Sequence, residues 1–595
     1  MENVIPRKEY PRPQFEREQW LPLNGTWQFA FDDRNTGEKE KWYRDESCAF
    51  NQTIVVPYCF QSELSGIGDT SFHDVVWYRR GFLIPAAYTG KRMVLHFGAV
   101  DYAAKVWVNG ELVMTHQGGH TPFSADITSV LIDGENMVVV RAEDYSQDVT
   151  LPRGKQYWKE NSDIVFYTRT TGIWQSVWLE PVSELSLRRV RMTPDIDRNV
   201  VSIRSFIEGD MKGKYVELQT EVTFKGQPIC RDRMDIVAEE EERLLKLNDF
   251  NDHGMGRWWT PEKPQLYDVK FTLVVDGEIM DEVKSYFGMR KISIVDGVFC
   301  LNNRPYYMKL ILDQGYFPGG VLTAATDEAL LEDIGYTKAM GFNGVRKHQK
   351  LEDPRYLYHC DRLGLLVWGE GANAYDYSEK YVSRFIQEWQ EAIERDYNSP
   401  SLVVWVPINE SWGIPNVLND VRQQQHGLTM YHLTRSLDTT RPVISNDGWE
   451  HLKSDLFTIH DYEWRREVLQ SRYETKEQTV VSNPQGRWLS VPGFQYGGEP
   501  ILMSEFGGVS FMKSAAEGWG YSAAKDSQDF LERIVNIIHP ILNNGVFQGY
   551  CYTQLTDVEQ EKNGLLTFNR EPKLPLEIIK QINAGINPKL PVQVN

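Results

Sequence analysis

Short apolar runs alternate with stretches of helical periodicity after about residue 290, and this alternation limits the fold more than any other feature. Two of the stretches, 327–340 closed by Gly341 and 379–397 closed by Asn398, have the spacing of amphipathic helices with a stop residue. Strands alternating with helices in this way over ~300 residues predict a (β/α)8 TIM barrel, although no long helical stretch separates the fifth, sixth and seventh runs. The eight apolar runs are 306–312, 342–348, 365–369, 402–408, 442–446, 456–461, 501–505 and 545–553.

The preceding part of the chain has strand periodicity instead. Its first part consists of short alternating segments separated by turns, and Asn109-Gly110 after one of them signals a hairpin. Further along, 215–224 alternates cleanly, and roughly a hundred residues of such strands fit an immunoglobulin-like sandwich. We therefore predict a β-sandwich over residues 1–182, an immunoglobulin-like sandwich over 183–289 and the barrel over 290–595.

The acidic balance of the chain narrows its partners. Its 595 residues include 64 Lys and Arg against 83 Asp and Glu, a formal charge of −19. Nucleic-acid binding requires a basic face, so no nucleic-acid partner is expected. No apolar run approaches the ~18 residues that a membrane helix needs, and no secretory signal is visible. These observations predict a cytoplasmic protein without a membrane partner.

The cysteines and the aromatic residues add less. No two cysteines form a C-x-x-C pair, so neither a zinc site nor a disulfide framework is indicated, and free thiols in a reducing compartment are the simplest account. Aromatic residues make up 12%, which suits carbohydrate binding and equally suits large cores in β-rich domains. The cysteines are Cys48, Cys59, Cys230, Cys300, Cys360 and Cys551.

Two of the apolar runs end in a carboxylate. The run 402–408 is followed by Asn409 and Glu410, and 501–505 ends in Glu505. The C-terminal ends of barrel strands meet at the face that carries catalytic groups. Two carboxylates facing one another are what glycoside hydrolysis needs, and Asn409 is placed to bond the hydroxyl beside the reacting carbon. On the residues alone, a solvated loop position for either carboxylate is equally plausible.

Longer motifs resemble glycoside hydrolase family 2, the family of the β-galactosidases and β-glucuronidases. The resemblance implies a jelly-roll first domain, an immunoglobulin-like second domain and a catalytic (β/α)8 barrel. It implies that Glu410 is the acid/base and Glu505 the nucleophile, in a retaining mechanism with carboxyl groups ~5–5.5 Å apart. The motifs are Leu23-Asn-Gly-Thr-Trp27, Val76-Trp-Tyr-Arg79, Val106-Trp-Val-Asn-Gly110, Thr171-Gly-Ile-Trp-Gln-Ser-Val-Trp178, Phe287-Gly-Met-Arg290, Leu301-Asn-Asn-Arg-Pro305, Asn343-Gly-Val-Arg346-Lys-His348, Asn409-Glu410-Ser411 and Ser504-Glu505-Phe-Gly507.

The same resemblance implies further site residues. Tyr462 matches a tyrosine beside the nucleophile, and Arg346 matches an arginine whose charge favours the ionised carboxylate. His348 alternates onto the strand face of Arg346, and Asp313 ends the first strand, where it would bind non-reacting hydroxyls. For each of these a structural role, as a packed residue or an ion pair, remains open.

Strand eight departs from the better-known members. Tyr552 stands where the family often has a tryptophan that forms the sugar platform, and Gln554 follows it as a further substrate-binding candidate. β-Glucuronidases carry an Asn-x-Lys pair just after this strand, whereas this chain has Glu561-Lys562-Asn563. An acidic side chain there would repel a uronate, so a neutral glycone is predicted.

The sequence therefore predicts a retaining exo-β-glycosidase, β-galactosidase-like, that acts on a small-molecule, oligosaccharide or glycoconjugate substrate without a metal or other cofactor. The alternatives are a glycosidase for a uronic acid or an arabino-configured sugar and, in a different class, a non-catalytic carbohydrate-binding protein. The loop 116–123 is expected to reach over the barrel mouth. Relatives self-associate through their sandwiches, so a homo-oligomer is possible, but no residue demonstrates it.

Overall fold

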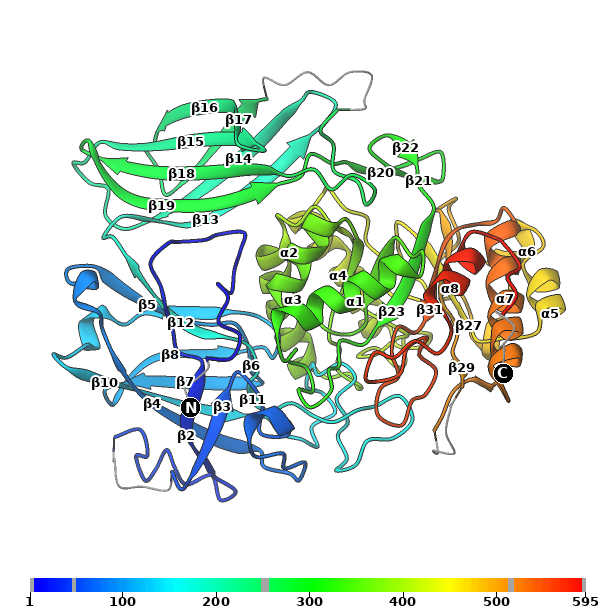
Figure 1. Ribbon diagram of the computed structural model, residues 1–595, viewed down its shortest axis with the longest axis horizontal. Coiled ribbons are helices and arrows are strands. Elements are labelled where there is room, and N and C mark those ends of the chain that lie inside the picture. Colours follow the sequence, from blue (N-terminus) through cyan, green and yellow to red (C-terminus); the bar gives the residue numbers. More distant parts are fainter. Residues whose placement is uncertain (1–4, 45–49, 248–255, 512–517, 591–595) are drawn as a thin grey trace.

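Two β-sandwiches and a parallel barrel make up the computed structural model, which describes residues 5–44, 50–247, 256–511 and 518–590 (Figure 1). In Figure 1 the first sandwich is blue to cyan, the second lies above it, and the barrel occupies the other side of the molecule. Cys48 lies outside the described residues, and the other five cysteines are free thiols. Within the described ranges, no helix combines the length and the apolar character needed to span a bilayer.

The first sandwich packs a four-stranded sheet, β1-β12-β5-β9, against a six-stranded sheet, β3-β2-β4-β10-β7-β8. Large apolar side chains such as Trp27 and Tyr78 fill the space between them. A short pair, β6 with β11, lies beside the sandwich and flanks a long connection after β10. The strands are β1 Leu21–Pro22, β2 Gly25–Phe31, β3 Gln52–Val56, β4 Val75–Leu83, β5 Arg92–Phe97, β6 Val100–Asp101, β7 Ala103–Val108, β8 Glu111–Gln117, β9 Phe123–Asp126, β10 Glu135–Glu143, β11 Gly172–Ile173 and β12 Val177–Val182.

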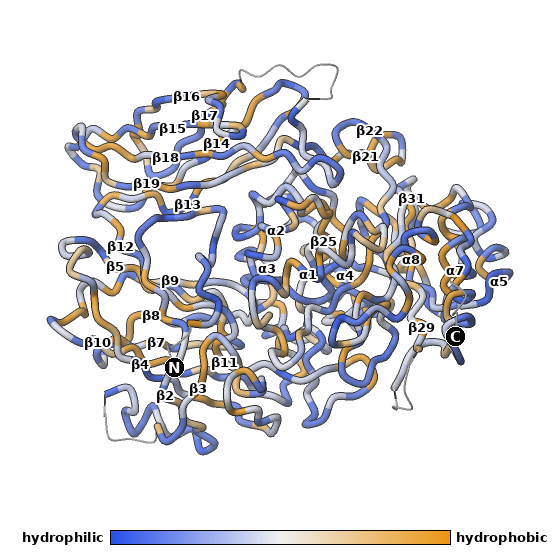
Figure 2. The backbone as a smooth tube through the Cα atoms, viewed as in Figure 1, coloured by the Kyte–Doolittle hydropathy of each residue, from blue (hydrophilic) through white to orange (hydrophobic). Residues whose placement is uncertain are grey.

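The second sandwich has a three-stranded sheet, β13-β14-β17, and a four-stranded sheet, β16-β15-β18-β19. Along β15 every second residue is buried, so one face of the strand packs into the core, as the alternation predicts. Figure 2 shows the same alternation of hydrophobic and hydrophilic stretches along these strands. The strands are β13 Ser186–Asp195, β14 Val200–Glu208, β15 Val216–Phe224, β16 Gln227–Asp235, β17 Glu240–Lys246, β18 Tyr267–Val275 and β19 Glu278–Phe287.

The described part of the barrel contains seven regular parallel strands in the order β26-β25-β24-β23-β31-β28-β27. The two helices predicted most clearly are confirmed, with α1 and α3 each ending one residue before the predicted last residue. The strands are β23 Met308–Asp313, β24 Gly344–Lys347, β25 Leu366–Glu370, β26 Leu402–Val406, β27 Phe457–Asp461, β28 Ile501–Gly507 and β31 Phe547–Thr553, with the short strands β20 Ile292–Val295, β21 Val298–Leu301, β22 Arg304–Pro305, β29 Val509–Ser510 and β30 Ser522–Ala523. The helices are α1 Asp327–Ala339, α2 Pro354–Leu363, α3 Glu379–Asp396, α4 Val421–Leu437, α5 Arg466–Arg472, α6 Lys476–Val480, α7 Ser527–Asn543 and α8 Leu576–Asn583.

The fifth predicted strand is an irregular segment that closes the barrel between β26 and β27. It touches β26 through single bridges, Trp405 with Val443 and Asn409 with Asp447, rather than through a ladder. Two backbone N–H groups of this segment donate to side chains rather than to a neighbouring strand. Val443 N–H donates to the Asp455 carboxylate at 2.8 Å. Ser445 N–H likewise donates to a serine hydroxyl at 3.0 Å. The segment therefore occupies a strand position without regular strand hydrogen bonding.

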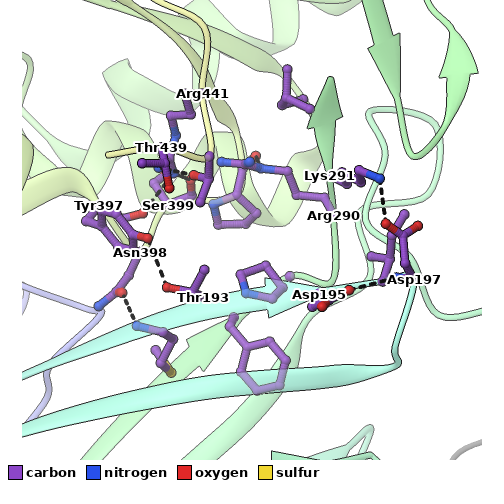
Figure 3. Close-up of a pocket in the computed structure, with 18 residues that line it drawn as sticks. Thr193, Asp195, Asp197, Arg290, Lys291, Tyr397, Asn398, Ser399, Thr439 and Arg441 are labelled. Carbon is purple, nitrogen blue, oxygen red and sulfur yellow. Dashed lines mark hydrogen bonds and ion pairs between the residues drawn. The ribbon is translucent and has the colours of Figure 1, made fainter. Parts of the chain in front are cut away.

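Two buried arginines lie where the second sandwich meets the starting ends of the barrel strands, and Arg290 joins the two domains while Arg441 braces the barrel side. Arg290 donates to the carbonyls of Pro400 and Leu402 at 3.0 and 2.8 Å. Arg441 donates to the carbonyls of Tyr397 and Ser399 at 2.8 and 2.7 Å. A cavity of about 370 Å³ lies at this junction (Figure 3). Both guanidinium groups donate to backbone carbonyls and hold the structure together at this junction. The cavity therefore has a structural role, and it lies on the barrel face opposite the one that carries Glu410 and Glu505.

Candidate active site

The two predicted carboxylates meet at the C-terminal face of the barrel. Glu410 follows β26 and Glu505 lies within β28. One carboxylate oxygen from each, together with a ring nitrogen of His460, lie within 4.8 Å of one another. This spacing agrees with the short gap of ~5–5.5 Å between carboxyl groups in retaining glycosidases.

The backbone that presents Glu410 is in an uncommon conformation. Glu410 and Ser411 have φ values of 49° and 60°, in the left-handed region that non-glycine residues avoid. Hydrogen bonds hold this turn, with Glu410 N–H donating to the Asp447 carbonyl at 3.0 Å and Ser411 N–H to Asn446 Oδ1 at 2.8 Å. Such conformations persist where their surroundings impose them and are frequent at active sites.

Three further predicted residues, Arg346, Tyr462 and Asn409, are linked by hydrogen bonds to Glu505 or to one another. Arg346, fully buried on β24, donates to Glu505 Oε1 at 3.1 Å, and Tyr462 Oη donates to Glu505 Oε2 at 2.6 Å. Arg346 also donates to Asn409 Oδ1 at 2.6 Å. Because an arginine can only donate, it fixes the Asn409 oxygen inward. The Asn409 Nδ2 donor has no partner among the described residues, so it is available for a substrate hydroxyl.

His460 is a central residue that the sequence reasoning missed. Its Nδ1–H donates to Glu410 Oε1 at 2.8 Å and lies 3.5 Å from Glu505 Oε2, while its Nε2–H donates to Asp447 Oδ2 at 3.0 Å. Burial opposes the charge of the ring, but Glu505 and Asp447 outweigh it and raise the pKa of His460 to about 10. Its position two residues before Tyr462 on β27, hence on the same face, was the available signal.

The raised pKa of His460 predicts a pH-dependent stability. The stabilisation from the charged ring is fully present below the ordinary pKa of 6.5 and is lost as pH rises through about 10. We expect His460→Asn, which cannot be charged, to remove this loss, so that the gap in Tm between wild type and variant narrows from pH 6.5 to pH 10. Thermal melts across that range measure it, with His432→Asn on the exposed face of α4 as control. A gap that stays constant with pH would contradict the assignment.

His348 and Glu370 complete the buried polar layer. His348 Nε2 lies 3.9 Å from Glu505 Oε1, and its Nδ1 lies 3.1 Å from Glu370 Oε1. Burial, Lys155 and Arg346 hold the pKa of His348 well below its usual range, so the ring is neutral. Burial raises the pKa of Glu370 to about 7 against the opposing effect of Arg346. The structure thus places His348 beside Glu505, on the strand face of Arg346.

Asp313 is not brought to the site, and the expectation that it binds sugar hydroxyls is corrected. Its carboxylate accepts from Lys347 Nζ at 2.7 Å and from Gly315 N–H at 2.8 Å. The alternation of side chains along β23 explains why Asp313 points away from the site. Leu312 packs in the barrel interior, whereas Ile311 faces the helices, and Asp313, two residues after Ile311, faces the same way. Gln314 takes the inward position instead and donates to Gln554 Oε1 at 2.8 Å.

Tyr552 and Gln554 also lie away from the predicted positions. Tyr552 is fully buried among residues that face the helices, with its ring 5.7 Å from that of Phe506, so it cannot form the sugar platform. The next residue, Thr553, has the inward direction, and its Oγ1 lies 3.3 Å from Tyr462 Oη. Gln554 is fully buried and donates to Asn563 Oδ1 at 2.7 Å, so it positions the loop after β31 rather than contacting substrate.

Three family models match the chain consecutively. The model "Glycosyl hydrolases family 2, sugar binding domain" matches residues 21–180, "Glycosyl hydrolases family 2" matches 186–290, and "Glycosyl hydrolases family 2, TIM barrel domain" matches 292–508. The chain belongs to glycoside hydrolase family 2. This family 2 chain therefore has the three-part architecture that its sequence motifs implied.

Named relatives divide between two activities. The chain is 27% identical to a β-galactosidase of Thermoanaerobacter pseudethanolicus over 74% of its own length, but it spans only 56% of that relative. It is 24% identical to the β-glucuronidase of Felis catus, with 95% of this chain and 90% of that protein covered. Among solved structures, a β-glucuronidase from Ruminococcus gnavus superimposes with a TM-score of 0.76 at 19% identity, covering 97% of this chain and all of the other. The structural likeness shows the shared fold.

The loop predicted to cover the mouth of the family 2 barrel packs elsewhere. His116 Nε2 lies 3.0 Å from Glu391 Oε2, and the His120 N–H donates to Glu388 Oε1 at 2.8 Å, so this loop docks on the outer helix α3. A different segment of the first sandwich reaches the site, namely the connection 144–171 between β10 and β11. Its Gly154 N–H donates to the Asn373 carbonyl at 2.9 Å, beyond the end of β25.

Gly154 permits this close approach. Its φ is 60°, and a Cβ there would lie 2.2 Å from a backbone oxygen of the loop after β24, so no other residue fits without displacement. The following residue, Lys155, is 7% exposed, with its Nζ 4.9 Å from the centre of the Trp412 ring. In the described part of the chain Lys155 has no side-chain hydrogen bond or ion pair, while its charge acts on both His348 and Glu561.

Glu561 has a different environment from the one its sequence position suggested. Its carboxylate accepts from the Tyr167 hydroxyl and, at 2.8 Å, from Asn563 Nδ2. Burial raises the pKa of Glu561, with Tyr167 and Lys155 acting in the opposite direction. Both side chains at the Asn-x-Lys positions are therefore used within the protein, and neither presents a cation to the substrate.

Proposed function

We propose that the chain is a retaining exo-β-glycosidase that works by double displacement. The observation that carries the proposal is the Glu410–Glu505 pair within 4.8 Å, with Arg346 and Tyr462 fixing both oxygens of Glu505. Glu505 attacks the anomeric carbon while Glu410 gives its proton to the glycosidic oxygen, so the C–O bond to the aglycone breaks and a glycosyl ester forms. Glu410 then takes a proton from water, whose oxygen displaces Glu505.

A neutral, galactose-like glycone is the form of the proposal that the loop after β31 supports. The acidic Glu561 and the neutral Asn563 fill the positions of the glucuronidase Asn-x-Lys pair, and they hydrogen-bond to each other. Asn409 Nδ2, which has no partner among the described residues, suits a sugar hydroxyl, and such a hydrogen bond strengthens as the transition state develops. An arabino-configured glycone shares this hydroxyl pattern and is a variant of the same proposal.

One observation favours a uronic acid as the second candidate. The buried ammonium of Lys155 projects beside the site without an anionic partner in the described residues. A carboxylate on the glycone would supply the missing negative charge, and charge-assisted hydrogen bonds of this kind are strong. The glucuronidases among the relatives and solved structures agree with this candidate.

A panel of p-nitrophenyl glycosides separates the two candidates. We expect release of p-nitrophenol from the β-galactoside or the α-L-arabinoside, and a change of at most a few fold on Lys155→Met. If the β-glucuronide is instead the best substrate, Lys155→Met should lower its kcat/KM by about 10²-fold, since breaking a buried charge pair costs several kcal/mol. Lys159→Met, four residues along on the exposed side of the same segment, is the matched control. Silence on every glycoside would favour a carbohydrate-binding protein.

We also propose a cytoplasmic location and no nucleic-acid partner. The free thiols of the described cysteines support the location, and the formal charge of −19 supports the absence of a nucleic-acid partner. Light scattering measures whether the chain associates into homo-oligomers.

A further inference from the structure

The exposed edge of Glu410 marks where the departing part of the substrate lies. The Glu410 side chain is 19% exposed, against 5% for Glu505. Because the acid gives its proton to the glycosidic oxygen, the aglycone bonded to that oxygen must lie against whatever surrounds this edge. Trp412 begins that surrounding surface. It lies two residues after Glu410, and its backbone N–H donates to the Asn409 carbonyl at 2.9 Å.

Four aromatic side chains gather there from two domains, and we call them the aromatic cluster: Trp158, Phe166, Tyr375 and Trp412. The ring centres of Phe166 and Trp412 are 5.3 Å apart, and those of Trp158 and Tyr375 are 4.4 Å apart. Tyr375 meets Trp412 edge to face at 5.9 Å. Trp158 and Phe166 come from the segment 144–171 of the first sandwich, whereas Tyr375 and Trp412 follow the barrel strands β25 and β26.

Docking of the segment on the barrel does not by itself account for the cluster. Tyr157, in the same segment, stacks on Phe166 at 5.0 Å and is buried, as expected of a ring that only packs the segment against the barrel. Tyr375 in contrast is 46% exposed, and the other three rings are partly open. Partly open aromatic surfaces at a domain junction are characteristic of ligand sites, because they offer large apolar area with little loss of side-chain freedom.

We propose that the aromatic cluster is the aglycone subsite and that it takes a flat aromatic ring attached through the glycosidic oxygen. This inference rests on the proposed glycosidase function. The rings meet at interplanar angles of 30° and 78° around Trp412, so an incoming ring can stack on one face and meet another ring edge-on. A saturated ring of equal size would gain only the apolar contact.

The test compares benzyl and cyclohexylmethyl glycosides of whichever glycone the panel identifies. The two leaving alcohols are similar in size and acidity and differ in the flatness of the ring. We expect wild type to favour the benzyl glycoside by about fivefold in kcat/KM, and Tyr375→Ala and Trp158→Ala to bring the ratio close to one. Tyr215→Ala, which removes an exposed tyrosine of the second sandwich, should leave the ratio unchanged.

The outcomes separate this inference from the glycosidase proposal. Equal rates on the two compounds in wild type would overturn the subsite while leaving the glycosidase intact. Variants that lose both activities equally together with Tm would show that the cluster only joins the domains. Failure on both compounds and on every panel glycoside would overturn the proposed function, and the subsite with it.

Discussion

Glu505→Gln is expected to lower turnover of aryl β-glycosides by at least about 10⁴-fold, because the amide cannot attack the anomeric carbon and removal of a nucleophile costs this much or more. Arg346 can still donate to the amide oxygen, and the Tyr462 hydroxyl, which now donates to the second carboxylate oxygen, can instead accept from the amide nitrogen, so the fold should survive. The measurement is release of p-nitrophenol from the panel substrate that wild type prefers. Glu577→Gln, an exposed carboxylate on α8, serves as the matched control.

Azide rescue makes the nucleophile test independent of folding. In Glu505→Ala the loss of the carboxylate leaves space in which azide can attack the anomeric carbon. The product should be the α-glycosyl azide, with inverted configuration. Recovery of activity with that product identifies Glu505 as the nucleophile. An active Glu505→Gln enzyme, or rescue that yields the β-azide, would contradict the assignment.

The second large effect is expected at Glu410 and depends on the leaving group. Glu410→Ala should lower kcat/KM by about 10²–10⁴-fold for a substrate with an alkyl aglycone, because proton transfer to the departing oxygen is lost. A dinitrophenyl glycoside, whose phenolate leaves without a proton, should be cleaved at a rate much closer to that of wild type. The comparison of the two substrates in one variant is the measurement.

Azide rescue also distinguishes an acid/base role of Glu410 from a structural one. With Glu410 replaced by alanine, azide should attack the glycosyl ester on Glu505 and yield the β-glycosyl azide. Equal losses for the alkyl and dinitrophenyl substrates would argue that Glu410 acts on the fold and not on the proton. Glu474→Ala, in the loop between α5 and α6, is the control for loss of an exposed carboxylate.

The strand ends were predictable because apolar runs mark the strands directly, and carboxylates at their ends must share one face of the barrel. That argument located Glu410 and Glu505 although 95 residues separate them in sequence. It failed by one residue at Asp313 and at Tyr552, where Gln314 and Thr553 have the inward direction. A strand alternates every residue, and the pattern of a doubly buried strand does not reveal which parity faces the interior.

Other site residues depended on contacts that no local pattern encodes. Lys155 reaches the site from a connection in the first sandwich, more than 200 residues before Glu410 in the sequence. Asp447 belongs to the irregular fifth segment, so its place beside His460 follows from barrel closure rather than from strand periodicity. Only His460 had a usable signal, the two-residue spacing from Tyr462.

The connection 144–171 enters the barrel mouth and is held there at Gly154. As a result, the groups proposed for the reaction and part of the surface proposed to select the substrate are encoded in different domains, and evolution can change one without the other. In our proposal the barrel carries the reacting carboxylates, Glu410 and Glu505, whereas part of the surface that would contact the substrate belongs to the first sandwich. Recombination that exchanges the first sandwich between relatives could therefore change what is cleaved without disturbing how. For protein engineering, libraries confined to this connection would explore new glycosides against an unaltered catalytic background.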